Sequence, residues 1–495
     1  MTLKAMLENS AVKYARKTAI VLGERRISYA ELDEASNKVA NALIAKGLRK
    51  GDRVIIMLPD GPDFVTFYFG ICKAGGIAIP LDIRLKLNEL TCLLENCRPK
   101  ILVTEATIAE AVIPSLSCLD YIKHIINTGS SNDTRFLSYS DILISSSAQR
   151  INTKLAPDDI ATISYAGGPT NHPLGVMLSH YSLTKATSIY ARGFHQTDND
   201  VVMLFSLPMY HVYGLAAVLL TSIYAGSTVV VVTGTGRSIG TLLETIEREK
   251  GTMFLGVPYI YALATNVAMR EGVKNNLNSL RLCVSAGAPL TTSIIDRFKQ
   301  YYNFDIIDMW GLTESVAQVT CPDTSDRIKP GSQGKALPGW EIKAVDNNGN
   351  ELPSNQPGEI IVKGLIMKGY YHNHQATTQA IQNDWLHTGD IGRIDQDGYL
   401  FLTGRKKTLI ISKGQNVFPS DIEEVLQTNP KIAEVKVIGV PDELRGEIIK
   451  AIVVLKDGQE ATEQEIRDFC RQRMSEYKLP KHVVFADALP RFAIA

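Results

Sequence analysis

A glycine-rich stretch, ISYAGGPTNHPLGV at residues 163–176, has the residue types of a loop that binds phosphate. A β-like run precedes Gly167, Gly168 and Thr170, and a helical pattern follows them. Glycines let backbone N–H groups approach a phosphate, and threonine supplies a hydroxyl. The GK[ST] ending of a Walker loop is missing. A phosphate loop and an ordinary turn therefore both remain open for this stretch alone.

A second stretch, DMWGLTES at residues 308–315, places Thr313 and Glu314 shortly after a predicted strand. Threonine can contact a phosphate oxygen, and hard divalent cations prefer carboxylate oxygens such as that of Glu314. The same two residues could also do no more than cap a helix. Both interpretations remain open from the residues alone.

A third stretch, WLHTGDIGRIDQDGYLFLTGRKK at residues 385–407, supplies Asp390 and Arg405. A carboxylate can accept hydrogen bonds from both hydroxyls of a ribose. Taken singly, charged residues of this kind are more often turn formers or surface residues.

The elements around these stretches alternate between strand and helix patterns, which predicts an α/β architecture with parallel sheets. The pattern runs through the first 150 residues and again over 160–340, whereas hairpin-like segments follow residue 340. A compact α+β unit of helices and strands closes the chain. We place the boundary at the lysine-bearing bridge, giving domains 1–404 and 405–495. A chain of 495 residues is too long for one compact core.

Composition excludes several classes of partner. Lys plus Arg and Asp plus Glu are both 52, so the formal net charge is zero and no nucleic-acid or membrane-surface partner is indicated. The seven cysteines form no CxxC pair, which argues against zinc or a disulfide framework. The N-terminus lacks the apolar core of a signal peptide, and no apolar run reaches spanning length. We expect a soluble cytoplasmic protein.

Together, the motifs and their order resemble the adenylate-forming superfamily of acyl-CoA synthetases, peptide-synthetase adenylation domains and beetle luciferases. The resemblance covers nearly the whole chain and is strongest in KAGGIAIPLD, LPMYHVYGL, SAGAPL, DMWGLTES, WLHTGDIGRID and GRKKTLIISKGQNVFPSDIEEVL. It implies a large N-terminal domain of layered α/β subdomains and a small mobile C-terminal domain. In this family a carboxylate attacks the α-phosphate of Mg-ATP, and a thiol then attacks the acyl-adenylate.

The resemblance also assigns roles to individual residues. It implies that Thr313 contacts the α-phosphate, Glu314 the Mg²⁺ ion, and Asp390 the ribose with the help of Arg405. Lys407 falls on the hinge position and counts with Thr313, Glu314 and His211 as catalytic. The other residues implied for ATP, AMP or coenzyme A are Thr170, Gly287, Ala288, Pro289, Asp308, Met309, Trp310, Gly311, Lys413 and Gly414.

The acyl pocket is expected around His211 in LPMYHVYG, with Tyr213, Gly256 and Trp310 as further substrate-binding residues. Amino-acid-activating relatives usually carry an aspartate in this segment, and this chain has none. The resemblance therefore favours a plain carboxylic acid, and the aromatic residues suit an aromatic, alicyclic or medium-chain one.

Two departures from the family pattern qualify this expectation. The usual YTSGTTGxPKGV reads YAGGPTNHPLGV here, so a family lysine is replaced by Leu174 and hydroxyls are lost at Gly167 and Pro169. Each missing charge-assisted bond costs ~1–3 kcal/mol, which predicts a retuned loop with a weaker hold on the β- and γ-phosphates. In addition, LPRFAIA stops at Ala495, one position before the expected adenylation lysine. A chain given only as far as it is ordered and a disabling truncation are both open.

The resulting expectation is an AMP-forming acyl-CoA synthetase that uses ATP, Mg²⁺ and coenzyme A, with a reversal toward ATP synthesis left open. One alternative is an enzyme that loads a carrier-protein phosphopantetheine, and another is an adenylate-binding pseudoenzyme. A homodimer is left open.

Overall fold

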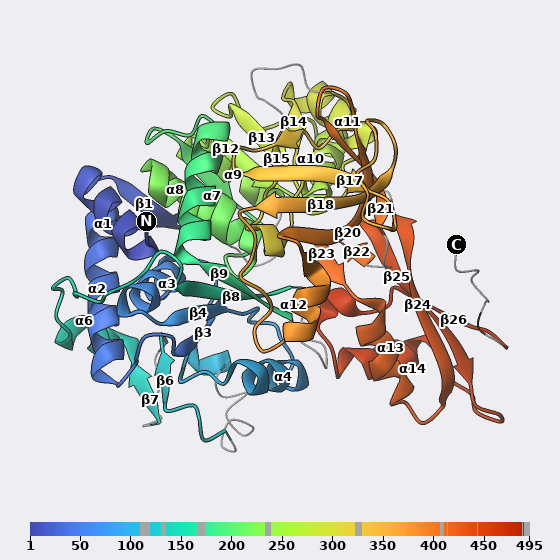
Figure 1. Ribbon diagram of the computed structural model, residues 1–495, viewed down its shortest axis with the longest axis horizontal. Coiled ribbons are helices and arrows are strands. Elements are labelled where there is room, and N and C mark those ends of the chain that lie inside the picture. Colours follow the sequence, from blue (N-terminus) through green and yellow to red (C-terminus); the bar gives the residue numbers. More distant parts are fainter. Residues whose placement is uncertain are drawn as a thin grey trace.

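The computed structural model describes residues 1–495 except 109–118, 130–134, 167–173, 233–238, 322–328, 406–409, 413, 443, 488 and 490–495. Figure 1 shows a large α/β body and a smaller unit, coloured orange to red, at one side. Among the described helices, none combines the length and the apolar character needed to cross a membrane.

The first large sheet has seven strands in the order β14-β13-β12-β10-β11-β1-β2. All neighbours pair in parallel except the edge pair β1/β2, a hairpin that turns at Gly23. The bounds are β1 (Thr18–Leu22), β2 (Arg25–Ser28), β10 (Val201–Leu204), β11 (Thr228–Val231), β12 (Met253–Gly256), β13 (Leu282–Ser285) and β14 (Ile306–Asp308). The short, buried apolar runs predicted as parallel strands therefore form this sheet.

The second sheet also has seven strands, in the order β7-β6-β5-β3-β4-β8-β9. Its neighbours are parallel apart from the antiparallel pair β8/β9. The bounds are β3 (Arg53–Met57), β4 (Ile77–Pro80), β5 (Ile101–Thr104), β6 (His124–Asn127), β7 (Phe136–Ser138), β8 (Ile160–Ala166) and β9 (Leu174–Ser179).

The pair β8/β9 corrects one expectation. The helix predicted over YSLTKATSIYARGF, residues 181–194, is present as α7, but strand β9 (Leu174–Ser179), which was not predicted, separates it from the glycine-rich stretch. Gly175 permits the close pairing of β9 with β8, because a Cβ at this position would lie 2.8 Å from Ile163 Cγ2 of the neighbouring strand. A strand, and not the start of a helix, therefore follows residues 167–173 in the chain.

Helices cover the faces of both sheets. Most of them share one large core with the sheets, whereas α4 packs against the second sheet in a separate core. In α2, Ser28 and Glu31 form a capping box that fixes the helix start. The bounds are α1 (Leu3–Lys13), α2 (Tyr29–Ala45), α3 (Pro62–Ala74), α4 (Leu87–Cys97), α6 (Tyr139–Ser145), α7 (His180–Gly193), α9 (Ile239–Glu249), α10 (Pro258–Glu271), α11 (Thr292–Tyr302) and α12 (His374–Ala380).

The apolar segment YGLAAVLLTSIYAG, residues 213–226, has the pattern of a helix, but it is not α-helical throughout. Its first part is the π-helix η1 (Tyr213–Leu220), and only α8 (Thr221–Ala225) is α-helical. The Thr221 hydroxyl donates to the Ala216 carbonyl, five residues back, at 2.8 Å. A π-helical segment of this kind is frequent at functional sites, and it begins within the motif that contains His211.

Residues after 315 form two further antiparallel sheets. The pair β15 (Thr320–Cys321) and β16 (Lys335–Ala336) is short, and the five-stranded sheet has the order β17-β18-β20-β19 with β21 on β20. Its bounds are β17 (Trp340–Val345), β18 (Gly358–Gly364), β19 (Ile381–Gln382), β20 (Trp385–Ile394) and β21 (Leu400–Arg405).

The C-terminal unit has its own sheet, of order β23-β22-β25-β24 with β26 on β25, and its own hydrophobic core. The predicted helices and strands of this region are present. The bounds are β22 (Ile410–Ser412), β23 (Gln415–Val417), α13 (Pro419–Gln427), β24 (Ile432–Asp442), β25 (Gly446–Leu455), α14 (Glu463–Arg471), η3 (Glu476–Lys478) and β26 (His482–Phe485).

Candidate active site

Three predicted segments meet at one edge of the first sheet. Strands β12, β13 and β14 are parallel neighbours, and Gly256, Ser285 and Asp308 are register partners at their carboxyl ends. The segments 286–289 and 309–311 therefore leave the sheet side by side. Ligands of open α/β sheets bind outside the carboxyl ends of the strands, so this edge is where a small molecule is expected.

Asp390 and Arg405 come from the neighbouring sheet and face each other in register on β20 and β21. Asp390 is only 2% exposed. Arg405 Nε lies 2.5 Å from Asp390 Oδ1, and Trp310 Nε1 donates to Asp390 Oδ2 at 2.9 Å. Burial raises the pKa of Asp390, while the Arg405 charge opposes that rise. An ionised carboxylate has about four acceptor positions, so two remain for a ligand.

Thr313 and Glu314 lie in a three-residue 3₁₀ turn, η2 (Thr313–Ser315), instead of capping an α-helix. Gly311 precedes the turn, where a Cβ would lie 1.8 Å from the Ala317 carbonyl oxygen, so a side chain is excluded. The Tyr370 hydroxyl donates to Glu314 Oε1 at 2.8 Å. Burial raises the pKa of Glu314, the Tyr370 bond lowers it, and the charges of Arg405 and Asp390 also act on it. Glu314 thus belongs to one electrostatic cluster with Asp390 and Arg405.

Asp308 is a buried carboxyl at the end of β14. Gln333 Nε2 donates to its Oδ2 at 2.8 Å, and Oδ1 has no hydrogen-bond partner among the residues that the structure describes. Burial raises the pKa of Asp308 to about 7. A buried acceptor without a protein donor suits a ligand that brings an N–H group.

The predicted acyl-pocket residues are also adjacent. The Tyr213 hydroxyl donates to the Gly256 carbonyl at 3.4 Å, and the Asp308 charge acts on Tyr213. Tyr213 N donates to His211 Nδ1 at 3.2 Å, so the proton of a neutral imidazole resides on Nε2. His211 is accessible to solvent, yet the surrounding protein displaces enough water to lower its pKa to about 4.

The C-terminal unit reaches the same edge through Gly414. Gly287 and Gly414 both have left-handed φ angles, of 82° and 78°. A Cβ on Gly287 would lie 3.8 Å from the Gly414 carbonyl oxygen, and a Cβ on Gly414 would lie 2.7 Å from Val257 Cγ1. Gly287 and Pro289 are exposed and Ala288 is half-buried, so this segment is open to a ligand. The structure therefore brings Gly414 to the predicted site.

Three predicted residues, Thr170, Lys407 and Lys413, lie outside the described part of the chain. Two residues that contact the site were not predicted, namely Tyr370, which holds Glu314, and Gln333, which holds Asp308. Both lie in segments remote from their partners in sequence, and nothing in their own residue type indicates the contact.

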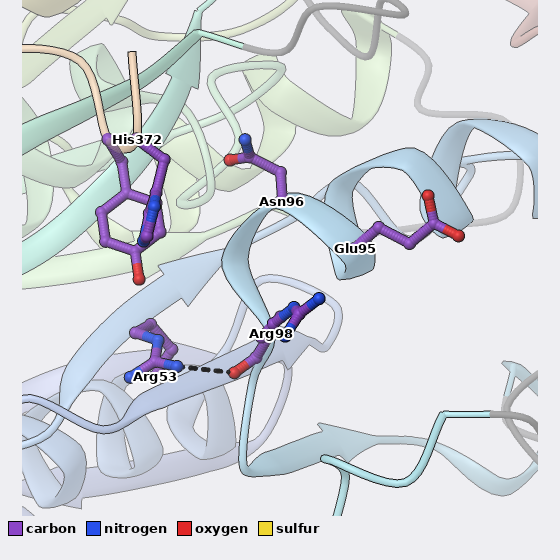
Figure 2. Close-up of a pocket in the computed structure, with 6 residues that line it drawn as sticks. Arg53, Glu95, Asn96, Arg98 and His372 are labelled. Atoms are coloured by element: carbon purple, nitrogen blue, oxygen red, sulfur yellow. Dashed lines mark hydrogen bonds between the residues drawn. The ribbon is translucent and has the colours of Figure 1, made fainter. Parts of the chain in front are cut away.

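Figure 2 shows a separate pocket of about 400 Å³. Its six described lining residues include none of the predicted site residues: Arg53, Glu95, Asn96, Arg98, Tyr371 and His372. Arg53 is fixed there by the carbonyl groups of Cys97 and Arg98, each at 2.9 Å. Because the predicted chemistry converges on the edge of β12–β14, we place the active site there and not in this pocket.

Comparison with known proteins identifies the class. The AMP-binding enzyme family matches residues 7–371, and the AMP-binding enzyme C-terminal domain matches residues 421–493. The chain belongs to this family. It is an AMP-forming acid–CoA ligase with a large N-terminal AMP-binding domain and a small C-terminal domain.

Individual relatives are similar over almost the full chain. A long-chain-fatty-acid–CoA ligase of Bacillus subtilis is 30% identical, covering 100% of this chain and 92% of the relative. The o-succinylbenzoate CoA synthetase MenE of Bacillus subtilis, a double mutant bound to its product analogue OSB-NCoA, is 27% identical with a TM-score of 0.86 over 99% of this chain and 95% of that one. ATP-bound MatB of Rhodopseudomonas palustris is 28% identical with a TM-score of 0.74, covering 100% of this chain and 97% of that one.

Proposed function

We propose that the protein activates an aromatic, alicyclic or medium-chain carboxylic acid with ATP, through an acyl-adenylate, and transfers the acyl group to coenzyme A. The observation that carries this proposal is the cluster of Asp390, Arg405, Trp310 and Glu314 beside the carboxyl ends of β12–β14. Such chemistry depends mainly on positioning and on neutralising charge.

The nucleotide fits the groups that the protein leaves unsatisfied. Asp390 retains two acceptor positions, which suit the two ribose hydroxyls, and Arg405 holds its carboxylate in place. The unpaired Asp308 Oδ1 suits the amino group of adenine. The segment Gly287–Pro289 and the backbone of Met309–Gly311 then flank the base.

Mg²⁺ fits Glu314 as a single protein ligand. Mg²⁺ keeps several waters and is usually held by one or two carboxylates plus substrate phosphates. Glu314 Oε2 is left for it because Tyr370 binds Oε1, and Thr313 and Thr170 would contact phosphate oxygens. When bound, the ion would neutralise charge on the phosphates.

The acid is proposed to lie against Tyr213, Gly256 and Trp310. Tyr213 and Trp310 are nearly buried, and their polar atoms are bonded to the Gly256 carbonyl and to Asp390, so any surface they contribute to the pocket is apolar. His211, neutral at physiological pH, can donate its Nε2–H to the substrate carboxylate. Together these groups suit an apolar acid better than an amino acid.

The domain division 1–404 and 405–495 is part of the proposal, with Lys407 as the hinge and Lys413–Gly414 on the loop that faces the thiol. The closeness of Gly414 to Gly287 and Val257 supports the view that this orientation serves the thioester step. The cysteines that the structure describes form no disulfide, which supports a cytoplasmic location.

The test is a panel of carboxylic acids assayed with ATP and either coenzyme A or a carrier protein. We expect acid-dependent pyrophosphate exchange and consumption of free coenzyme A with apolar acids. Acylation of the carrier protein alone would favour the carrier-loading alternative. Absence of exchange with every acid, despite AMP binding, would favour a pseudoenzyme.

A further inference from the structure

A cluster of buried charges lies where the C-terminal domain meets the N-terminal one. Glu89, Asp421 and Lys478 are 7%, 8% and 1% exposed. Lys478 Nζ lies 3.0 Å from Asp421 Oδ2 and 3.6 Å from Glu89 Oε1. Asp421 and Lys478 belong to the C-terminal domain, whereas Glu89 belongs to α4 of the N-terminal domain.

The first turn of α4 makes further bonds across the same junction. The Ser475 hydroxyl donates to Glu89 Oε2 at 2.5 Å, and Asn88 Nδ2 donates to the Arg473 carbonyl at 2.9 Å. Glu89 also accepts the Lys86 N–H at 3.0 Å, in the capping box that starts α4. The carboxylate is thus fixed by its own helix and aimed at segment 473–478.

This arrangement depends on the orientation of the two domains. Asp421 and Lys478 stay together wherever the C-terminal domain goes, because they share that domain. Glu89 keeps Ser475 and Lys478 only while segment 473–478 rests on α4. This orientation buries the Glu89 carboxylate, which is costly unless the carboxylate is paired and hydrogen-bonded. The bonds from Ser475 and Lys478 offset that cost, so removing either one weakens this orientation relative to others.

The same orientation brings Gly414 onto Val257 and Gly287 at the active site. The contact also adjoins the acyl-pocket motif. Burial raises the pKa of Tyr477, and Glu89, Asp82 and Tyr210 all act on it. Tyr210, the residue before His211, donates to Asp82 at 2.8 Å. The junction therefore lies next to the motif that contains His211, a residue of the proposed acyl pocket.

We propose that Glu89 is a positioning residue that latches the C-terminal domain in the orientation that places Gly414 on the active site. Its carboxylate binds Ser475 and Lys478 in that orientation and loses both when the domain turns. The kinetic consequence rests on the proposed two-step function: the latch promotes thioester formation and has no part in adenylation.

The test uses Glu89→Gln in the full-length protein. Glutamine keeps the capping-box bond to Lys86 but removes the charge that faces Lys478. Ser475→Ala is an independent second variant that acts from the other domain. The matched control is Glu95→Gln, an exposed glutamate on the same helix away from this junction.

Hydrogen exchange at the amides of residues 473–478 measures whether this segment stays on α4, and the measurement does not depend on enzymatic activity. We expect exchange there to rise at least about fivefold in Glu89→Gln and Ser475→Ala, with Glu95→Gln unchanged. Single-turnover thioester formation should slow by a similar factor, while pyrophosphate exchange stays at the unsubstituted level. Unchanged exchange at 473–478 in both variants would overturn the latch.

Faster hydrogen exchange at residues 473–478 together with an unchanged rate of thioester formation would show that Glu89 does not position the C-terminal domain for that step. If the unsubstituted protein shows no pyrophosphate exchange, the proposed function is wrong. Hydrogen exchange at residues 473–478 still tests the latch, because that measurement does not depend on the proposed function.

Discussion

At the scale of single residues, Asp390 interacts with several other residues of the candidate site. It is buried, bonded to Trp310 and Arg405, and adjacent to Glu314. We predict that Asp390→Ala weakens ATP and AMP binding together by at least about tenfold, because hydrogen bonds to charged groups are worth ~1.5–3 kcal/mol. Calorimetric titration with both nucleotides measures this effect.

Trp310→Phe serves as the matched variant for Asp390. It keeps one aromatic ring and removes the indole N–H that orients the carboxylate, together with the second ring of the indole. Because Asp390 itself remains, the loss of affinity should be smaller and again equal for ATP and AMP. Unchanged nucleotide affinity in Asp390→Ala would refute the ribose assignment.

Asp308 gives a pH prediction. Burial raises its pKa from 3.8 to about 7, so the folded state binds a proton more tightly than the unfolded state. Its contribution to stability is complete below pH 3.8 and is lost as the pH rises through about 7; at ~1.4 kcal/mol for each pKa unit, it amounts to at most about 4 kcal/mol.

Asp308→Asn removes this titration. We therefore expect the Tm of the variant to rise relative to that of the unsubstituted protein as the pH increases from 5 to 8. Thermal unfolding scans across this range check it. Parallel pH profiles of the two proteins would mean that Asp308 does not titrate there.

The residues of this site show what sequence patterns can reveal. Asp390 and Glu314 stood out because they lie in motifs with a chemical rationale. The register that sets Arg405 opposite Asp390 and the contacts of Tyr370 and Gln333 arise from the pairing of distant segments. Such pairings depend on tertiary structure, which no local pattern contains.

At the scale of elements, the strands of the first large sheet were predictable because buried parallel strands are short apolar runs between turn residues. In the second large sheet, β3 and β8 were predicted in this way and β4–β7 were not. The strand β9 and the π-helix η1 were not predicted either. LGVMLS is too short to show a clear period, and a π-helical segment has nearly the same apolar pattern as an α-helix. Both elements flank motifs of the active site.

The hairpin β8/β9 fixes the position of Leu174, which belongs to the glycine-rich stretch. Leu174 is the first residue of β9, and its partly buried side chain packs against the large core. A lysine at this position can bury its stem along the same surface and carry its ammonium beyond it. We predict that Leu174→Lys tightens ATP and pyrophosphate binding several-fold and leaves AMP affinity nearly unchanged.

Competition binding with the three ligands measures this difference, and Leu174→Met controls for the loss of leucine. If Leu174→Lys leaves ATP and pyrophosphate affinity unaltered, residue 174 does not face the polyphosphate. Looser binding of ATP in the unsubstituted protein would hasten its release, which suits an enzyme that also runs toward ATP synthesis.

At the scale of the whole molecule, the two domains meet at the active site and at the α4 junction, and the chain between them passes through residues 404–408. A hinge must absorb backbone rotation between states. Lys407→Pro fixes φ at that position, so we predict that thioester formation falls at least about tenfold while pyrophosphate exchange stays near normal.

Single-turnover assays of each half-reaction measure the two rates in Lys407→Pro. Because proline restricts the hinge while Glu89→Gln releases the latch, the two variants act on opposite sides of the same motion. Their combination should therefore slow thioester formation by less than the product of the two single effects, since a latch has little to hold when the domain cannot turn. Equal loss of both half-reactions in Lys407→Pro would count against a hinge at residue 407, and strict multiplication of the two effects would show that the hinge and the latch act independently.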